Sequence, residues 1–397
     1  MLPVEDHRQI GQKLDLFHFQ EEAPGMVFWH PRGYAMLSAL RAALARVAER
    51  DGFEEVLTPQ ILRQRVWDVS GHSAHYRDAM FAIEDSEQPA FAKPVSCPGH
   101  LEIFRRRAAS YRDLPLRYAE FGLVHRNEPS GTLHGLFRLR QFTQDDGHVF
   151  CQRPQLEAEV ARFCVSLKKC YAALGFEGVE VAFSTRPESR AGSDADWDEA
   201  ESRLARAAAQ AGLAPTLVPG GGAFYGPKLE FSLQDSARRR WQCGTIQLDL
   251  VLPERFDVSY VESGGARERP AMLHRAVLGS LERFLGVLLE HHQGHVPAWL
   301  APEQVVVLPV AEAQGEAARE AAGEFAAHGV RARVDARAES LARRVLEAHE
   351  RATPFVIVIG ERERRGGLFT LRSGSEQRVL SSAEAVAELT RAVTPPI

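Results

Sequence analysis

The sequence lacks the features that would place the protein in a membrane or in an oxidising compartment. Its 397 residues include only five cysteines, which are scattered and give no disulfide framework. No apolar run approaches the ~20 residues that a membrane helix needs. The first ten residues lack the charged and then apolar pattern of a secretory signal. These absences predict a cytoplasmic protein with no membrane partner.

Strong positive charge and glycine-rich nucleotide motifs are also absent. The net charge is −5, so a nucleic-acid partner would have to bind local basic patches. Only five residues are lysine and 43 are arginine, a bias that we attribute to genome composition. The abundance of arginine therefore indicates no function. Neither G-x-G-x-x-G nor G-x-x-x-x-G-K-[ST] occurs, and Rossmann and P-loop nucleotide sites are unsupported.

The most informative stretch that is present runs from residue 116 to residue 150. Residues 116–126 have the composition of a strand, residues 127–131 that of a turn, and the chain can be extended again from Phe137. Alternation in the second strand places six chemically active side chains on one face: Arg138, Arg140, Phe142, Gln144, Asp146 and His148. This face is either the solvated side of an edge strand or a platform for a ligand that carries phosphate and a base.

Elsewhere the hydrophobic spacing predicts an α+β protein with two regions. A helix is expected over 34–51, followed by a strand through 56–59. Two apolar segments, 223–233 and 241–252, predict an antiparallel hairpin, and a helix is expected over 274–291. From about residue 300 onward, apolar strand-length runs alternate with helical patterns. That alternation predicts a separate α/β domain with a mostly parallel sheet.

Several strings in the sequence resemble class II aminoacyl-tRNA synthetases, and within that class the threonyl-tRNA synthetase family. The strongest are HRNEPSG with FTQDDGH, CPGH, SYRDLPLRYAEFG, GAFYGPKLEF, WQCGTIQLDL and LHRAVLGSLERF. The resemblance implies a catalytic domain over 1–299, built on an antiparallel sheet, and an anticodon-binding-like domain over 300–397. Motifs 1, 2 and 3 of the class would lie at about 34–59, 116–150 and 274–291.

The resemblance implies an ATP site that activates the amino acid by attack on the α-phosphate. Arg126 would bind the α-phosphate and the amino acid carboxylate, Arg283 the γ-phosphate with help from Arg138, and Phe142 would stack on adenine beside Glu128. The implied ATP-binding residues are Arg126, Glu128, Arg138, Phe142, Gln242, Thr245 and Arg283. Mg²⁺ would accompany ATP. Lys228 would neutralise charge on the substrate or phosphate, and His72 would relay a proton near the terminal adenosine of tRNA.

The family likeness also implies a zinc-containing threonine pocket. Spacing alone does not predict a metal site at Cys97, His148 and His274, but these residues match the zinc ligands of the family. One thiolate and two imidazoles suit one Zn²⁺ per chain and leave room for substrate. The amino group and hydroxyl of threonine could then bind the metal, which excludes valine. The other pocket residues implied are Gln144, Asp146, Tyr225 and Gln247.

Partners and acceptor follow from the same likeness. A homodimer through the motif 1 helix and tRNA(Thr) as acceptor are expected. The sequence shows no N-terminal editing domain, so measurable activation of serine, without correction by this chain, is also expected. The segment from Asp335 to Ala342 departs from the family pattern at three positions. Two alternatives therefore stay open: transfer of threonine to a carrier protein, and a non-catalytic regulatory paralog.

Overall fold

The computed structural model describes residues 5–84, 88–176 and 178–397, which form two compact units. One unit contains residues 21–26, 41–285 and Ile397, and the other contains residues up to Gln20, 27–40 and 286–396. The second unit therefore includes N-terminal segments that the predicted boundaries assign to the region before residue 300. Within the described residues, no helix has both the length and the apolar character needed to cross a membrane.

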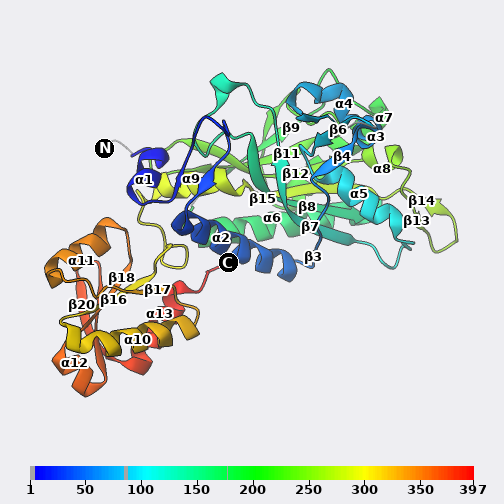
Figure 1. Cartoon of the computed structure of the whole chain (residues 1–397). Coiled ribbons are helices and arrows are strands. Elements are labelled where there is room, and N and C mark those ends of the chain that lie inside the picture. The colour runs from blue at the N-terminus through cyan, green and yellow to red at the C-terminus, as the bar shows by residue number, and fades with distance from the viewer. Residues whose placement is uncertain (1–4, 85–87, 177) are drawn as a thin grey trace. The chain divides into compact units, whose positions relative to one another are not determined.

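An eight-stranded sheet forms the centre of the unit around residues 41–285 (Figure 1). Only the two edge pairs, β10–β9 and β3–β7, are parallel; the pairs between them are antiparallel. In spatial order the strands are β10 (Thr216–Val218), β9 (Val179–Ser184), β11 (Lys228–Gln234), β12 (Arg240–Asp249), β15 (Ala271–Ser280), β8 (Gln141–Cys151), β7 (Leu116–His125) and β3 (Glu54–Glu55).

Helices and small sheets surround this central sheet. The helices are α3 (Gln64–Ser70), α4 (His72–His75), α5 (Cys97–Arg106), α6 (Leu156–Ala173), α7 (Asp194–Gln210) and α8 (Leu252–Arg255), and α2 (Pro31–Arg50) and α9 (Leu281–His291) each continue into the other unit. The small sheets are β4 (Ile61–Arg63), β6 (Ala90–Ala92) and β5 (Ala82–Ile83), and the pair β13 (Tyr260–Val261) and β14 (Arg267–Glu268).

The two faces of the central sheet have different coverings. On one face, Phe104 of α5 stacks on Phe150 of β8 with ring centroids 4.6 Å apart. On the other, Tyr171 of α6 donates a hydrogen bond to the Val277 carbonyl at 2.6 Å. Because successive side chains of a strand point to opposite faces, even-numbered residues of β8 lie on the α5 side and odd-numbered ones on the α6 side.

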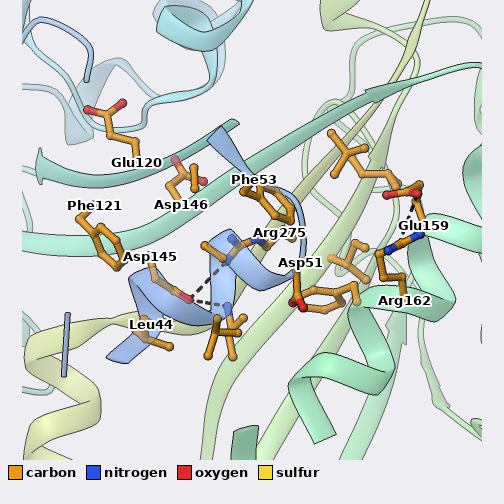
Figure 2. A pocket seen from close by; sticks show the side chains of 18 residues that line it. Leu44, Asp51, Phe53, Glu120, Phe121, Asp145, Asp146, Glu159, Arg162 and Arg275 are labelled. Carbon is orange, nitrogen blue, oxygen red and sulfur yellow. Dashed lines mark hydrogen bonds and ion pairs between the residues drawn. The ribbon is translucent and has the colours of Figure 1, made fainter. Parts of the chain in front are cut away.

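A buried carboxylate on the α6 side secures the junction between β15 and α9. Asp145 accepts hydrogen bonds from the backbone N–H groups of Val277, Leu278 and Gly279 at 2.7–3.0 Å. The pairing of β15 with β8 is irregular at this point. Arg275 lies 3.8 Å from Asp145, and both are buried beside a small cavity (Figure 2). Burial raises the pKa of Asp145 to about 6, and Arg275 and the three N–H groups oppose that rise.

The other unit contains a five-stranded mixed sheet. Its strands, in spatial order, are β17 (Ala332–Val334), β16 (Val305–Pro309), β18 (Phe355–Ile359), β19 (Leu368–Ser373) and β20 (Glu376–Ser381). Helices α10 (Gly315–Ala327) and α13 (Ser382–Val393) cover one face and α11 (Leu341–Glu350) the other. The remaining elements of this unit are α1 (His7–Lys13), β1 (Phe17–His18), β2 (Phe28–Trp29) and α12 (Glu361–Gly366).

Several predicted elements were wrong in type or extent. Residues 274–280 belong to β15 and not to a helix, because both faces of this strand are buried and its apolar residues match a helical spacing by chance. Strand β8 begins at Gln141, so Arg138 and Arg140 lie in the preceding loop. The 223–233 strand begins only at Lys228. The structure has no strand at 56–59, where one was predicted; β3 lies just before, at Glu54–Glu55.

The C-terminal sheet is also less parallel than predicted. Strand β16 pairs in parallel with β17 and β18, but β19 and β20 form an antiparallel hairpin after β18. No strand was predicted over the residues of that hairpin, 368–381. The α/β character of the region, with helices on both sides of a sheet, is nevertheless as expected.

The Asp145→Ala variant is expected to lose at least ~3 kcal/mol of unfolding free energy. The change leaves three buried N–H groups and the Arg275 guanidinium without their acceptor, and each loss is costly in a dry environment. Urea denaturation followed by circular dichroism measures the effect. Asp198→Ala, which removes a largely exposed carboxylate, is the control. Equal stability of the two variants would contradict this account of the junction.

Candidate functional site

The α5 side of the central sheet carries a row of polar side chains. Phe142, Gln144, Asp146 and His148 alternate along β8 and therefore share this face. His148 is paired directly with His274 on β15, and His274 is paired in turn with Gln247 on β12. Directly paired residues point to the same face, so three strands bring these groups together.

Three of the predicted residues form a compact group of metal-ligand atoms. Cys97, the first residue of α5, lies over the sheet beside His148 and His274, and the ligand atoms of all three lie within 4.8 Å of one another. All three side chains are buried. One sulfur and two imidazole nitrogens match the donor set that proteins use for zinc.

The hydrogen bonds of the histidines support a cation at this point. Asp249 Oδ2 lies 2.9 Å from His274 Nε2, so that nitrogen carries the proton and donates to the carboxylate. The other ring nitrogen, Nδ1, then presents a lone pair toward His148 Nε2, which is 3.0 Å away. Two nitrogens converging at this distance suit the coordination of one ion. The donor set and its geometry therefore fit a zinc ion.

Burial controls the protonation of the same group. It raises the pKa of Cys97 well above the ordinary value, and the carboxylates Asp146 and Asp249 raise that pKa further. Burial also lowers the pKa of His148, with contributions from the nearby His100 and His274, and so favours the neutral imidazole that binds metals. A thiolate here would need a cation beside it.

A polar cleft of about 450 Å³ opens at the end of the same face. All seven predicted ATP-binding residues line it: Arg126, Glu128, Arg138, Phe142, Gln242, Thr245 and Arg283. Gln144 lines it as well. Gln144 Oε1, Thr245 Oγ1 and Arg283 Nε are buried and have no hydrogen-bond partner among the described residues. Buried polar atoms are rarely left unpaired, so these three mark positions where a ligand can bind.

The arginines of the cleft are held by aromatic rings and by one ion pair. The Arg126 guanidinium lies 5.1 Å from the Phe142 ring centroid, and Arg283 lies 6.0 Å from that of Trp241. Arg138 forms an ion pair with Glu128 at 2.8 Å, and its side chain is half exposed. These contacts present positive charge to the cleft while the hydrocarbon parts stay packed.

The other predicted pocket residues lie close to the metal-ligand group. Tyr225 stacks on the His274 ring at 4.7 Å and donates a hydrogen bond to Gln247 Oε1 at 2.8 Å. Asp146 Oδ1 is 3.7 Å from His148 Nε2. A carboxylate, a phenol and an amide thus surround the group on the side of the sheet that α5 covers.

Two predicted catalytic residues lie outside these groups. Lys228 is at the beginning of β11, paired in register with Gln247, and its ammonium forms an ion pair with Glu230 at 2.9 Å. His72 is buried in α4, and its Nδ1 lies 2.8 Å from Ser70 Oγ. Burial, together with the positive groups around it, lowers the pKa of His72 to about 3, so the ring is neutral near pH 7.

Three residues of the site had no predicted role. Asp249 orients His274, and its position two residues after Gln247 in β12 could have revealed it, because both point to one face. His100 contacts His148, and although it belongs to the CPGH string, its contact depends on how α5 packs. Trp241 supports Arg283, and its position gave no signal in the sequence.

Comparison with known proteins agrees with this architecture. Residues 81–292 match the family described as tRNA synthetase class II core domain (G, H, P, S and T), and residues 304–391 match the anticodon binding domain family. The chain is 38% identical to a solved structure titled as the RNA binding domain of threonyl-tRNA synthetase from Cryptosporidium parvum Iowa II. The TM-score is 0.95, and 98% of each chain is covered. This chain belongs to the threonyl-tRNA synthetase family.

Curated relatives in bacteria give the same family at higher identity. The chain is 50% identical over 394 residues to a threonine–tRNA ligase of Caulobacter sp. (strain K31), with 98% of this chain and 60% of that protein covered. It is 49% identical to one of Laribacter hongkongensis, covering 93% of this chain and 58% of the relative. The chain thus spans about 60% of the length of these relatives. The predicted class II fold, with its antiparallel-rich sheet followed by an anticodon-binding domain, is confirmed.

The buried neutral state of His72 predicts a loss of stability in acid. The folded pKa, about 3, is below the ordinary value of 6.5, so below pH 6.5 the unfolded chain binds a proton that the native state does not. Stability should therefore fall as the pH drops from 6.5 toward 3, by at most ~1.4 kcal/mol per unit from this residue. His72→Gln should flatten that dependence, measured by urea unfolding at about pH 7.5 and about pH 5. His349→Gln, which changes an exposed histidine of α11, should leave it unchanged.

Proposed function

We propose that the protein activates L-threonine with ATP and transfers it to tRNA(Thr), acting in the cytoplasm. The observation that supports this most directly is the single sheet face that joins a three-ligand metal group to a cleft lined by all seven expected ATP-binding residues. Activation requires that phosphate charge be neutralised and that the two reactants be aligned. Both requirements fit the side chains present.

In this proposal the arginines bind the nucleotide. Arg126 neutralises the α-phosphate and holds the threonine carboxylate for attack. Arg283, with Arg138, binds the terminal phosphate of ATP, and Mg²⁺ accompanies the nucleotide. Phe142 stacks on adenine and Glu128 accepts its hydrogen bond. Because Glu128 is paired with Arg138 in the structure, nucleotide binding has to compete with that ion pair. Gln144, Thr245 and Arg283 supply the unpaired polar atoms of the cleft.

The threonine pocket of the proposal lies beside Cys97, His148 and His274, which would hold one zinc ion per chain. Bound zinc supplies a Lewis acid for the amino group and hydroxyl of threonine. Asp146 neutralises the substrate ammonium, and Tyr225 with Gln247 closes the pocket through their hydrogen bond. Lys228 adds positive charge near the substrate if its ion pair with Glu230 opens. His72, as a neutral imidazole, relays a proton near the terminal adenosine of tRNA during transfer.

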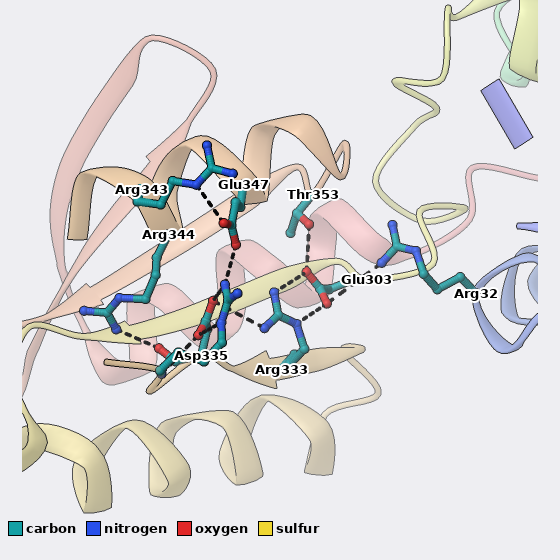
Figure 3. Close-up of polar contacts among 9 residues, drawn as sticks. Arg32, Glu303, Arg333, Asp335, Arg343, Arg344, Glu347 and Thr353 are labelled. Atoms are coloured by element: carbon teal, nitrogen blue, oxygen red, sulfur yellow. Dashed lines mark hydrogen bonds and ion pairs between the residues drawn. The ribbon is translucent and has the colours of Figure 1, made fainter. Parts of the chain in front are cut away.

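The acceptor is the least constrained part of the proposal. The anticodon binding domain family covers residues 304–391, which supports tRNA. The segment 335–340 before α11, however, is occupied by internal ion pairs. Asp335 and Glu347, both labelled in Figure 3, are each paired with Arg337, at 2.6 and 2.5 Å. The positive charge of Arg337 is neutralised by these two carboxylates and is therefore less available to bind RNA. Transfer to a carrier protein is therefore the second candidate, and a purely regulatory paralog is the third.

The decisive experiment measures pyrophosphate exchange with ATP, Mg²⁺ and each of the twenty amino acids, followed by acylation of total tRNA. Threonine-dependent exchange together with labelled tRNA(Thr) supports the proposal. Exchange without acylation favours a different acceptor. Absence of exchange with every amino acid rejects the enzymatic proposal.

Arg126→Ala and Arg283→Ala are each expected to reduce threonine-dependent exchange by the equivalent of ~3–4 kcal/mol of transition-state stabilisation. This is the loss typical of removing one charge-stabilising group from an active site. Arg106→Ala, which removes an exposed arginine of α5, should exchange like the wild type. Full activity of Arg126→Ala would reject the assigned role.

One tightly bound zinc per chain is expected, and Cys97→Ser should bind much less because the thiolate is lost. Elemental analysis of the purified wild type and variant measures this directly. Cys164→Ser, which changes a buried cysteine outside the group, is the matched control and should retain its zinc. Full zinc content in Cys97→Ser would remove that residue from the site.

We also propose a homodimer through the motif 1 segment, which carries Tyr34 and Leu57 with 60% and 81% of their surface exposed. Large apolar side chains so exposed are consistent with a partner surface, and twofold dimers are the commonest oligomers. Leu57→Asp should shift the mass measured by light scattering toward the monomer. Leu346→Asp, on α11, should not. A wild type that is monomeric at micromolar concentration would contradict the dimer.

A further inference from the structure

A chain of buried polar side chains extends from His148 away from the metal-ligand group. His148 Nδ1 lies 2.8 Å from His100 Nδ1, and His100 Nε2 lies 3.1 Å from Glu120 Oε2. Glu120 Oε1 lies 2.6 Å from Lys93 Nζ. The side chains of His100, Glu120 and Lys93 have no exposed surface. The chain thus links a candidate ligand to a buried ion pair.

If His148 binds a metal, only one assignment of protons to the ring nitrogens of His148 and His100 satisfies every hydrogen bond in this row of side chains. The carboxylate of Glu120 accepts, so His100 Nε2 carries a proton. His100 Nδ1 is then an acceptor, and it takes the proton of His148 Nδ1. That leaves the lone pair of His148 Nε2 directed at His274 Nδ1, 3.0 Å away. The ring nitrogen that binds a metal is set by the hydrogen bond that the other nitrogen makes.

Glu120 is fixed at the end of the chain by four donors. Besides His100 and Lys93, the backbone N–H and the hydroxyl of Thr58 donate to it at 3.2 and 2.8 Å. Burial raises the pKa of Glu120, but the hydrogen bonds from these residues outweigh it and lower the pKa to about 2. Glu120 is on β7 and His100 on α5, while Lys93 follows β6. The carboxylate is therefore ionised and held by several elements.

We propose that His100, anchored by Glu120 and Lys93, is a positioning residue that holds His148 in its metal-binding tautomer. The inference rests on the proposed zinc site. It adds a specific role for three residues that do not themselves contact the metal or the substrate. The alternative is that the chain only stabilises the fold. The two differ in one respect: the positioning role needs an acceptor opposite His148 Nδ1, and the structural role does not.

Two substitutions at His100 separate these roles. His100→Phe keeps a planar ring of similar size but offers no acceptor to His148. His100→Gln restores the pattern, because its amide oxygen can accept from His148 Nδ1 and its amide nitrogen can donate to Glu120. Tyr118→Phe is the matched control, since Tyr118 packs edge-on against His100 but takes no part in the hydrogen bonds that link His148 to Lys93. Circular dichroism and thermal unfolding verify that each variant folds.

The measured quantity is zinc affinity of the metal-free full chain, obtained by competition with a chromophoric chelator. Cobalt(II) substitution adds a spectroscopic readout, because its thiolate and ligand-field bands report ligand number and geometry. His100→Phe should bind zinc ~10–100-fold more weakly, the loss typical for a partner of a metal-ligating histidine. Its cobalt bands should shift. His100→Gln should recover most of the affinity, and Tyr118→Phe should match the wild type.

Wild-type affinity and cobalt spectrum in His100→Phe would overturn the inference, and so would equal losses in His100→Phe and His100→Gln. If His100→Phe does not fold, the double variant Lys93→Met with Glu120→Met is used, because it removes both buried charges together and leaves His100 Nε2 without its acceptor. An unchanged zinc affinity there would also overturn the inference. A wild type that binds no zinc would instead reject the proposed metal site, so the two failures are distinguishable.

Discussion

The direct pairing of His148 with His274 across β8 and β15 is the constraint on which the site depends. If β15 slipped by one residue in this register, His274 would turn toward α6 while His148 stayed beside Cys97, and the two imidazoles would be separated. Burial of both faces of β15 makes such a slip costly. Asp145 adds a second restraint, because the hydrogen bonds that it accepts from Val277, Leu278 and Gly279 fix the irregular stretch of β15 next to β8. Packing on one face thus determines chemistry on the other.

Buried charged side chains lie on both sides of the central sheet. Asp145 and Arg275 lie on the α6 side, whereas Glu120 and Lys93 lie on the α5 side. Removing one partner from such a pair is strongly destabilising, although the intact pair adds little net stability. Buried ion pairs of this kind restrict the positions of the strands that carry them. One of these strands is β8, which contains Asp145 and also positions Asp146 and His148 beside Cys97.

The sequence predicted the fold class and the residues that share motifs, but not how separate segments meet. Alternation along β8 correctly placed Phe142, Gln144, Asp146 and His148 on one face, because that face follows from period two alone. Cys97, His148 and His274 came from resemblance, since 126 residues separate the two histidines and no spacing rule connects them. Residues 274–280 were misassigned because a doubly buried strand has no alternation to detect. The contacts of His100 and Glu120 depend on helix packing, which no local pattern encodes.

The scarcity of lysine has a practical consequence once the burial of each lysine is known. Lys93 is fully enclosed, Lys228 is partly covered by its ion pair, and Lys13, Lys168 and Lys169 are exposed. An acylating reagent should therefore modify the three exposed amines quickly and reach Lys93 only when the core around Glu120 opens. Because the sequence has only five lysines, peptide mass spectrometry can compare the modification rate of Lys93 with the rates of the three exposed lysines. The rate at which Lys93 is modified therefore reports how often the buried network around Glu120 opens.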